Sequence, residues 1–150
     1  MKSNLQQING FLQNQKIGLV GVSRKKEKFG NQVMEGLLKA GYAVVPVHRE
    51  LTTINEIACV ATVSALPDDV NALCLVVPKT ETDELLKAAL QKGIQNIWIQ
   101  QMSDGPETDQ IASESNANIV RGRCIFMYTK PTGIHKFHER LSKFFGSYGK

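Results

Sequence analysis

The sequence predicts an α/β protein with a Rossmann-like fold, a doubly wound parallel sheet of five strands with helices on both faces. Two observations indicate this class. Short apolar runs alternate with amphipathic segments of about ten residues, the pattern of repeated strand–helix units. A basic loop that begins and ends with glycine separates the first strand from the next helix, at residues 21–30. Right-handed crossovers then lead us to expect the strand order 3-2-1-4-5.

The composition is that of a small globular protein. Its 150 residues, 42% hydrophobic and 21% charged, predict one domain over residues 1–150. Within it we expect an N-terminal helix at 1–15, a nucleotide-binding core at 16–125 and a C-terminal amphipathic helix at 131–150. The net charge of +4 favours a small anionic ligand such as a nucleotide, and it gives no argument for nucleic acid.

No part of the sequence predicts export, membrane insertion or metal binding. The first twenty residues lack the apolar stretch of a signal peptide, and no run is long enough for a membrane span, so we expect a cytoplasmic protein. Cys59, Cys74 and Cys124 are widely separated, which argues against a disulfide framework or a zinc site. His135 and His138 lack an obvious third ligand.

The first strand and the loop after it form the centre of the predicted site. An apolar, β-branched run at residues 17–22 predicts a strand buried on both faces. Gly21 and Ser23 allow a sharp turn at its end, and Gly30 suits the start of a helix that stops near Gly41. The loop between them contains Arg24, Lys25, Lys26, Glu27, Lys28 and Phe29.

Basic side chains at this loop predict a phosphate site, because backbone N–H groups and the helix dipole attract an anion there. The dinucleotide fingerprint G-x-G-x-x-G is not satisfied, since Ser23 and Lys26 stand where its second and third glycines belong. A solvated basic loop on an ordinary α/β domain is the alternative interpretation.

The second strand, predicted at residues 42–47, is followed by His48, Arg49 and Glu50. NAD-binding domains generally place an acidic side chain here to bind the ribose hydroxyls. The two cations that come first suit a ribose that carries a phosphate, as in coenzyme A or NADP. Glu50 keeps NAD open as an alternative.

The residue pattern directly after the second strand is irregular, and the pattern of strands and helices beyond it is clear. We expect a helical turn at 54–58, an extended piece at 59–63, and strands at 71–77, 94–100 and 118–120. Thr80 or Thr82 is expected to cap a helix with Asp83 in its first turn, and a shorter helix is expected at 107–115. Cys74 lies inside an apolar run, so we interpret it as a core residue.

The carboxyl ends of parallel strands meet at one edge of a sheet, where such folds bind their ligands. We therefore expect one crevice surrounded by residues 21–30, 47–49, 77–79 and Gln100.

Five short motifs resemble a known family. They are Gly-Val-Ser-Arg at 21–24, Lys-Phe-Gly-Asn at 28–31, Gly-Tyr-Ala-Val-Val-Pro-Val at 41–47, Trp-Ile-Gln at 98–100 and Arg-Cys-Ile at 123–125. In this order they resemble the small bacterial and archaeal CoA-binding domain proteins described as YccU-like. Those proteins are similar to the N-terminal domain of the succinyl-CoA synthetase α-subunit.

The resemblance implies binding of coenzyme A or an acyl-CoA. The pyrophosphate would contact Gly21, Val22, Ser23 and Arg24. Further phosphates could be bound by Lys25, Lys26 and Lys28. The 3′-phosphoadenosine end would meet Val47, His48 and Arg49. The pocket wall would include Val77, Pro78 and Gln100, and the loop residues Phe29 and Gly30 complete the candidate site.

Three kinds of function follow from these observations. We favour a CoA-binding protein without chemistry of its own, because no Ser, His and acid stand at a spacing typical of catalysis. The alternatives are an NAD(P)-binding enzyme or redox sensor on the same fold, and a protein-interaction module with a vestigial nucleotide site. In that module the N-terminal helix and the aromatic face of the C-terminal helix, with Phe137, Phe144 and Phe145, would bind another protein or a second copy.

Two interpretations of Cys124 are open. Because Arg121 and Arg123 flank it, its thiolate would be stabilised and could form a mixed disulfide with the thiol of CoA. The alternative is a buried cysteine at a strand end.

Overall fold

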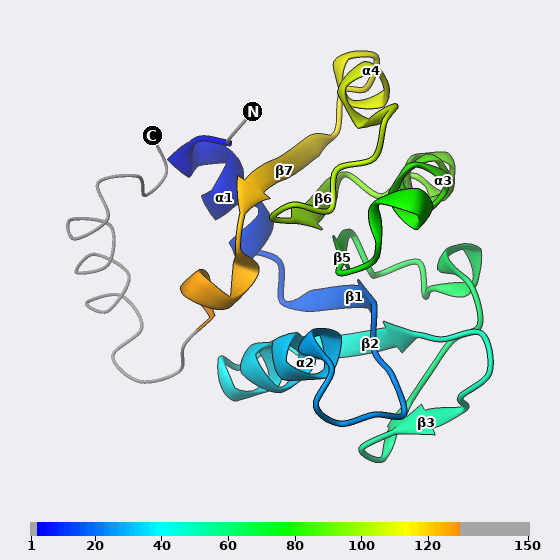
Figure 1. The fold of residues 1–150 in the computed structure, drawn as a ribbon. Coiled ribbons are helices and arrows are strands. Elements are labelled where there is room, and N and C mark those ends of the chain that lie inside the picture. The colour runs from blue at the N-terminus through cyan, green and yellow to red at the C-terminus, as the bar shows by residue number, and fades with distance from the viewer. Residues whose placement is uncertain (1–2, 130–150) are drawn as a thin grey trace.

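Five parallel strands form one sheet in the computed structural model, which describes residues 3–129. They are β1 (Lys16–Val20), β2 (Ala43–Val47), β5 (Ala72–Leu75), β6 (Asn96–Gln100) and β7 (Asn118–Arg123). Across the sheet they follow the order β2-β1-β5-β6-β7 (Figure 1). The expected C-terminal helix at 131–150, with His135 and His138, lies outside the described residues.

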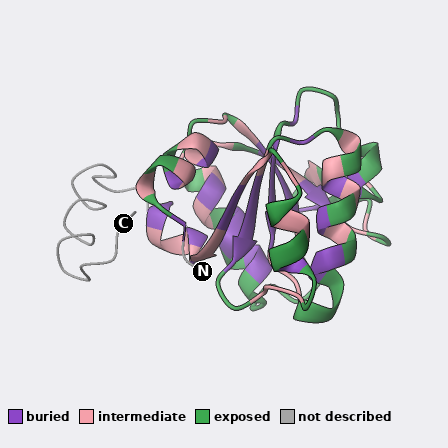
Figure 2. Ribbon diagram, turned by 90° about the horizontal axis from the view of Figure 1, so that it is seen from above, coloured by how far each residue is buried: buried purple, intermediate pink, exposed green. Residues whose placement is uncertain are grey.

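Helices cover both faces of this sheet (Figure 2). The helices α1 (Leu5–Leu12) and α2 (Phe29–Lys39) pack on one face, together with the short turn η2 (Ile125–Tyr128). The helices α3 (Lys79–Lys92) and α4 (Thr108–Ser113) pack on the other with the turn η1 (Val63–Ala65). The doubly wound α/β fold predicted from the sequence is thereby confirmed.

The strands are fixed by burial on both of their faces. All four residues of β5 are buried, and so are the three central residues of β1. Cys74 in β5 is fully buried, as expected of a core residue, and this burial raises the pKa of its thiol. Such uninterrupted apolar runs are typical of central parallel strands.

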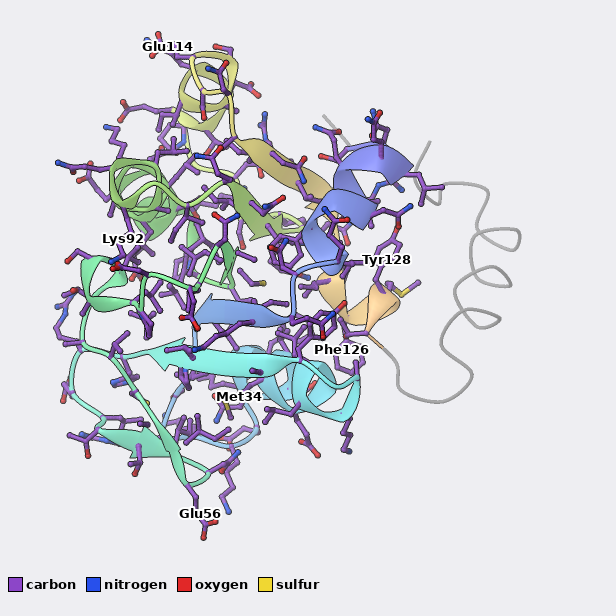
Figure 3. The ribbon with its side chains drawn as sticks, turned by 180° about the vertical axis from the view of Figure 1, so that it is seen from behind. Met34, Glu56, Lys92, Glu114, Phe126 and Tyr128 are labelled. Carbon is purple, nitrogen blue, oxygen red and sulfur yellow. The ribbon has the colours of Figure 1, made fainter. Side chains whose placement is uncertain are left out.

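Aromatic side chains attach the first and last described elements to the sheet. Trp98 of β6 packs its ring edge-on against Phe11 of α1, at 5.3 Å between centroids, and lies 5.6 Å from Tyr128 of η2. Its indole Nε1 donates a hydrogen bond to the carbonyl oxygen of Arg123 at 3.0 Å. Figure 3 shows Tyr128 and Phe126 on η2, beside the sheet. The chain therefore returns to its own start after β7.

The strand order differs from the expected 3-2-1-4-5. Numbered along the chain, the five strands stand in the order 2-1-3-4-5, because β5 pairs with β1. The piece at residues 59–63, expected to be extended, makes a single parallel bridge between Val60 and Val47 on the outer side of β2. The strand that we expected on that side of β2 is thus reduced to one bridging residue. The direction in which successive strands are added to the sheet reverses between β1 and β5.

Two local expectations are wrong. Residues 54–58 form no helical turn but a small hairpin of β3 (Thr53–Ile54) and β4 (Ile57–Ala58). Both residues of its turn have positive φ, 48° at Asn55 and 66° at Glu56, which is the backbone of a tight hairpin turn. The cap of α3 is Pro78 rather than a threonine, because the helix begins at Lys79 and both Thr80 and Thr82 lie inside it. Thr82 is buried and donates its hydroxyl to the carbonyl oxygen of Ser103 at 2.5 Å.

No helix among residues 3–129 has both the length and the apolar character needed to cross a membrane.

Candidate functional site

A cavity of about 790 Å³ opens at the carboxyl ends of β2, β1, β5 and β6, where the strand order reverses. Open parallel sheets bind their ligands at this kind of place. Twelve of the fifteen residues predicted for the site line the cavity. They are Gly21, Val22, Ser23, Lys28, Phe29, Gly30, Val47, His48, Arg49, Val77, Pro78 and Gln100.

Arg24, Lys25 and Lys26 do not line the cavity and are exposed beside it. Lys79, expected near the crevice, does not line it either. The cations of the loop therefore divide into Lys28, which faces the cavity, and three that face solvent.

Two glycines bring the start of α2 against the end of β1. Gly21 has a φ of 132°, a conformation open to glycine, and a side chain there would collide with the backbone carbonyl of Val76. A Cβ on Gly30 would collide with the carbonyl oxygen of Gly21. Gly30 thus allows the helix to pack closely on the strand, as the third glycine of the dinucleotide fingerprint does, although the loop before it is longer here.

Asn31 holds this loop in shape. Its side chain is 7% exposed, and its Oδ1 accepts a hydrogen bond from the backbone N–H of Ser23 at 2.7 Å. Its Nδ2 donates to the carbonyl oxygen of the same serine, also at 2.7 Å. The Ser23 hydroxyl in turn accepts the N–H of Lys25 at 3.1 Å. The sequence placed Asn31 only at a helix start, since its partner Ser23 lies eight residues back.

The N-termini of α2 and α3 both open onto the cavity. No side chain caps either helix, because the cap positions are Lys28 and Pro78. Phe29 and Gly30 of α2 and Glu81 of α3 line the cavity from the first helical turns. The unpaired N–H groups of a helix's first turn carry partial positive charge, so an anion is stabilised at such an end.

The corner after β2 is built around the imidazole of His48. Its Nδ1 accepts hydrogen bonds from the backbone N–H groups of Glu50, at 3.0 Å, and Leu51, at 2.9 Å. This turn brings Arg49 and Glu50 to the cavity. Glu50 also meets Arg24 across the mouth, with 3.5 Å between Arg24 Nη2 and Glu50 Oε2. The carboxylate expected to favour NAD is therefore already paired with a cation.

Several lining residues were not predicted. They are Val20, Glu50, Ala61, Val76, Glu81, Leu85, Gln101 and Ser103. Glu81 and Leu85 are one helical turn apart on α3, a spacing that puts both on one face of the helix, but the sequence gives no sign of which face meets the cavity. Gln101 and Ser103 belong to the turn after β6.

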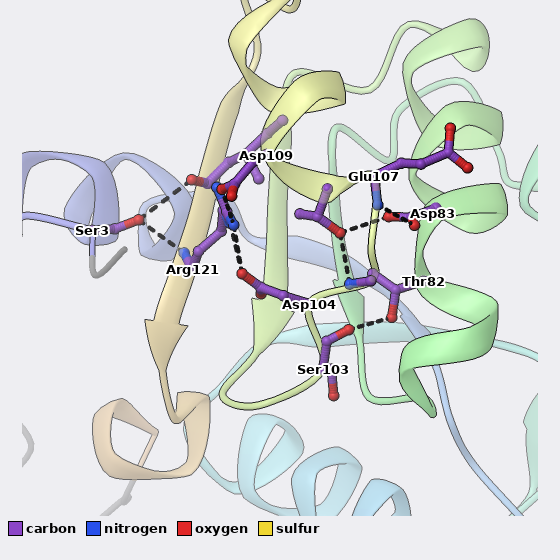
Figure 4. Close-up of polar contacts among 11 residues, drawn as sticks. Ser3, Thr82, Asp83, Ser103, Asp104, Glu107, Asp109 and Arg121 are labelled. Carbon is purple, nitrogen blue, oxygen red and sulfur yellow. Dashed lines mark hydrogen bonds and ion pairs between the residues drawn. The ribbon is translucent and has the colours of Figure 1, made fainter.

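A buried carboxylate fastens that turn to α3 (Figure 4). Asp83 is 7% exposed, and its Oδ1 accepts the hydroxyl of Thr108 at 2.6 Å while its Oδ2 accepts the N–H of Glu107 at 2.8 Å. The Thr108 hydroxyl oxygen accepts the N–H of Gly105 at 2.8 Å. The segment that carries Gln101 and Ser103 is thus attached to α3, which also lines the cavity.

Gln100 lines the cavity and contacts Cys124, which is half-buried rather than buried. Its Nε2 donates to Cys124 Sγ and its Oε1 accepts the N–H of Ile125, both at 3.0 Å. Cys124 itself does not line the cavity. The guanidinium of Arg121 is directed to Asp104 and Asp109, at 2.6 Å each. Among residues 3–129 there is no cluster of His, Cys, Asp and Glu arranged to hold a metal ion.

The fold and this cavity define a Rossmann-like domain with its ligand site at the switch point of the sheet. A family model described as a CoA binding domain matches residues 15–130, and the chain therefore belongs to that family. This confirms the resemblance drawn from the five motifs. No curated protein matches the chain.

Solved structures agree with this assignment. A hypothetical protein from Pyrococcus horikoshii OT3 is 31% identical at a TM-score of 0.73, covering 91% of this chain and 89% of its own. A conserved hypothetical protein from Pyrococcus furiosus is also 31% identical, at a TM-score of 0.71, over 75% of this chain and 97% of its own. The dinucleotide-forming acetyl-coenzyme A synthetase 1 of Ca. Korarchaeum cryptofilum shares the fold, at 22% identity and a TM-score of 0.54, over 67% of this chain and 22% of its own.

Proposed function

We propose that this protein binds coenzyme A or an acyl-CoA in the cavity at the switch point, and that it carries out no chemistry of its own. The observation that carries the proposal is the meeting of two uncapped helix N-termini with Lys28 and Arg49 around one cavity, in a chain of the CoA-binding family. Helix N-termini and cations are the groups that bind phosphates.

The pyrophosphate of the ligand would lie over the end of β1, against Gly21, Ser23 and the first turn of α2. The backbone of Gly21 and Gly30 lines the cavity there, beside the unpaired N–H groups of the first turn of α2, and such groups stabilise a phosphate. Lys28 supplies a positive charge from the same side. The exposed Lys25 and Lys26 add to the positive field at the mouth.

The 3′-phosphoadenosine end would lie at the corner after β2. Arg49 faces the cavity there, and the two hydrogen bonds that His48 accepts hold the turn that carries it. A guanidinium binds a phosphate with two parallel hydrogen bonds, which makes Arg49 the residue to distinguish CoA from its dephosphorylated form.

A titration of the protein with CoA and with dephospho-CoA tests this proposal, by calorimetry, with NADP and NAD in parallel. CoA is expected to bind more tightly than dephospho-CoA, and Arg49→Ala is expected to remove most of that difference, about tenfold for one charge-assisted contact. Lys39→Ala is the control, because this exposed cation stands in the last turn of α2 and does not line the cavity. Failure of CoA to bind, or weaker binding than NADP, contradicts the proposal.

An NAD(P)-binding function is the second candidate, since Glu50 lines the cavity beside β2. Its pairing with Arg24 counts against ribose binding by this carboxylate. Tight binding of NADH by a protein that ignores CoA would select this candidate.

A further inference from the structure

The end of the cavity far from β2 has a wall of its own. Glu81 and Leu85 line it from α3, and Gln101 and Ser103 line it from the turn after β6. This wall therefore presents one apolar side chain, two uncharged polar ones and a single carboxylate.

The position of this wall follows from the order of the strands. Adjacent strands β2, β1, β5 and β6 place their carboxyl ends in a row along one edge of the sheet. A ligand with its adenosine at the end of β2 and its pyrophosphate at the end of β1, as proposed above, continues over β5 and β6. The pantetheine arm and any acyl group on its sulfur then reach the α3 wall.

Charge is distributed unevenly along this row. Both cations that line the cavity, Lys28 and Arg49, stand on the side of β1 and β2. Among the described residues that line the cavity, no lysine or arginine comes from α3 or from residues 100–103. Glu81 stands in the first turn of α3, so its own carboxylate meets the partial positive charge of that helix end, and among the described residues no lysine or arginine that lines the cavity at this end attracts a second carboxylate.

We propose that Glu81 selects against acyl groups that end in a carboxylate, so that the ligand is free CoA or an acyl-CoA with an uncharged acyl group. This inference rests on the proposed function, because it takes its ligand from there. Two carboxylates facing each other in a shared cavity repel, whereas the methyl end of an uncharged acyl group packs against Leu85 without such a cost.

Butyryl-CoA and succinyl-CoA form a suitable pair of probes, since both have four-carbon acyl groups and only the second ends in a carboxylate. Binding of free CoA is measured first by calorimetry, and its absence overturns the proposed function together with this inference. If CoA binds, butyryl-CoA is expected to bind about three- to tenfold more tightly than succinyl-CoA at low salt, a range set by one partly screened pair of like charges.

Glu81→Gln is expected to abolish that difference, mainly by strengthening the binding of succinyl-CoA. Glu84→Gln is the matched control, because Glu84 lies on the same helix but does not line the cavity and contacts Lys87 instead, at 3.6 Å. Equal affinities of the two acyl-CoAs in the unaltered protein, or a difference that survives in Glu81→Gln, overturns this inference and leaves the proposed function intact.

Discussion

Replacing Asn31 by alanine should loosen the loop between β1 and α2, where we propose that the phosphates bind. The amide of Asn31 is 7% exposed and makes two hydrogen bonds of 2.7 Å, one with the N–H and one with the carbonyl oxygen of Ser23. These bonds join the start of α2 to Ser23, which lies three residues after the end of β1. Alanine removes both and leaves the two backbone groups without their partner.

The magnitude follows from these two bonds. A typical intramolecular hydrogen bond contributes about 0.5–1.5 kcal/mol, so Asn31→Ala should lower the free energy of unfolding by about 1–3 kcal/mol. For a domain of this size that corresponds to a fall in Tm of about 2–12 °C. Affinity for CoA should fall as well, because the ligand must then order the loop on binding.

Urea denaturation followed by tryptophan fluorescence measures the stability, since the single Trp98 lies in the core. Gln32→Ala is the control, because Gln32 is exposed and makes one bond of 3.2 Å to the carbonyl oxygen of Glu27. It should change the unfolding free energy by less than about 0.5 kcal/mol. If Asn31→Ala were as stable as Gln32→Ala and bound CoA equally well, the role we assign to Asn31 would be wrong.

Three further predictions concern the cavity walls and the edge of the sheet. Gly30→Ala should destabilise the protein by about 1–3 kcal/mol in urea denaturation, because its Cβ collides with the carbonyl oxygen at the end of the first strand. Asp83→Ala should cost about 2–3 kcal/mol, since it leaves the Thr108 hydroxyl and the partly buried N–H of Glu107 without their charged acceptor, and it should weaken binding of acyl-CoA more than of free CoA. The hydrogen bond and the charge of Arg121 lower the pKa of Asp109 below its ordinary 3.8. The ionised Asp109 carboxylate therefore stabilises the fold above that pH, and this stabilisation is lost as the pH falls and the carboxylate is protonated. Asp109→Asn should accordingly flatten the decline of Tm between about pH 5 and about pH 3.

Each of these predictions has a control and a contrary outcome. Gly36→Ala should be tolerated, because a Cβ there meets no backbone atom, only the Thr129 hydroxyl oxygen at 3.3 Å and the ring of Phe126 at 3.7 Å. Equal effects at both glycines would contradict the packing argument. Glu84→Ala removes an exposed carboxylate from the same helix as Asp83 and should change stability little. A pH profile of Asp109→Asn identical to that of the unaltered protein would show that the Arg121 contact contributes nothing to stability.

Local patterns predicted much of the fold and of the site. Apolar runs buried on both faces identified β1 and β5, because a central parallel strand needs no polar face. The basic loop between two glycines identified one side of the cavity, since turn geometry and charge both depend on neighbouring residues. The strand order was not predictable in the same way. It depended on how many residues of the segment at 59–63 would pair with β2, and only Val60 does.

The sequence by itself determined the α/β class, the family through its short motifs, and the residues at the strand ends that line the cavity. These features depend on residues close together in the chain. Only the tertiary structure decided that Asn31 holds Ser23, that Asp83 fastens the turn after β6, and that Glu81 rather than Lys79 lines the cavity from α3. Asp83 and Thr108 are 25 residues apart, and such a contact exists only after packing has brought two elements together.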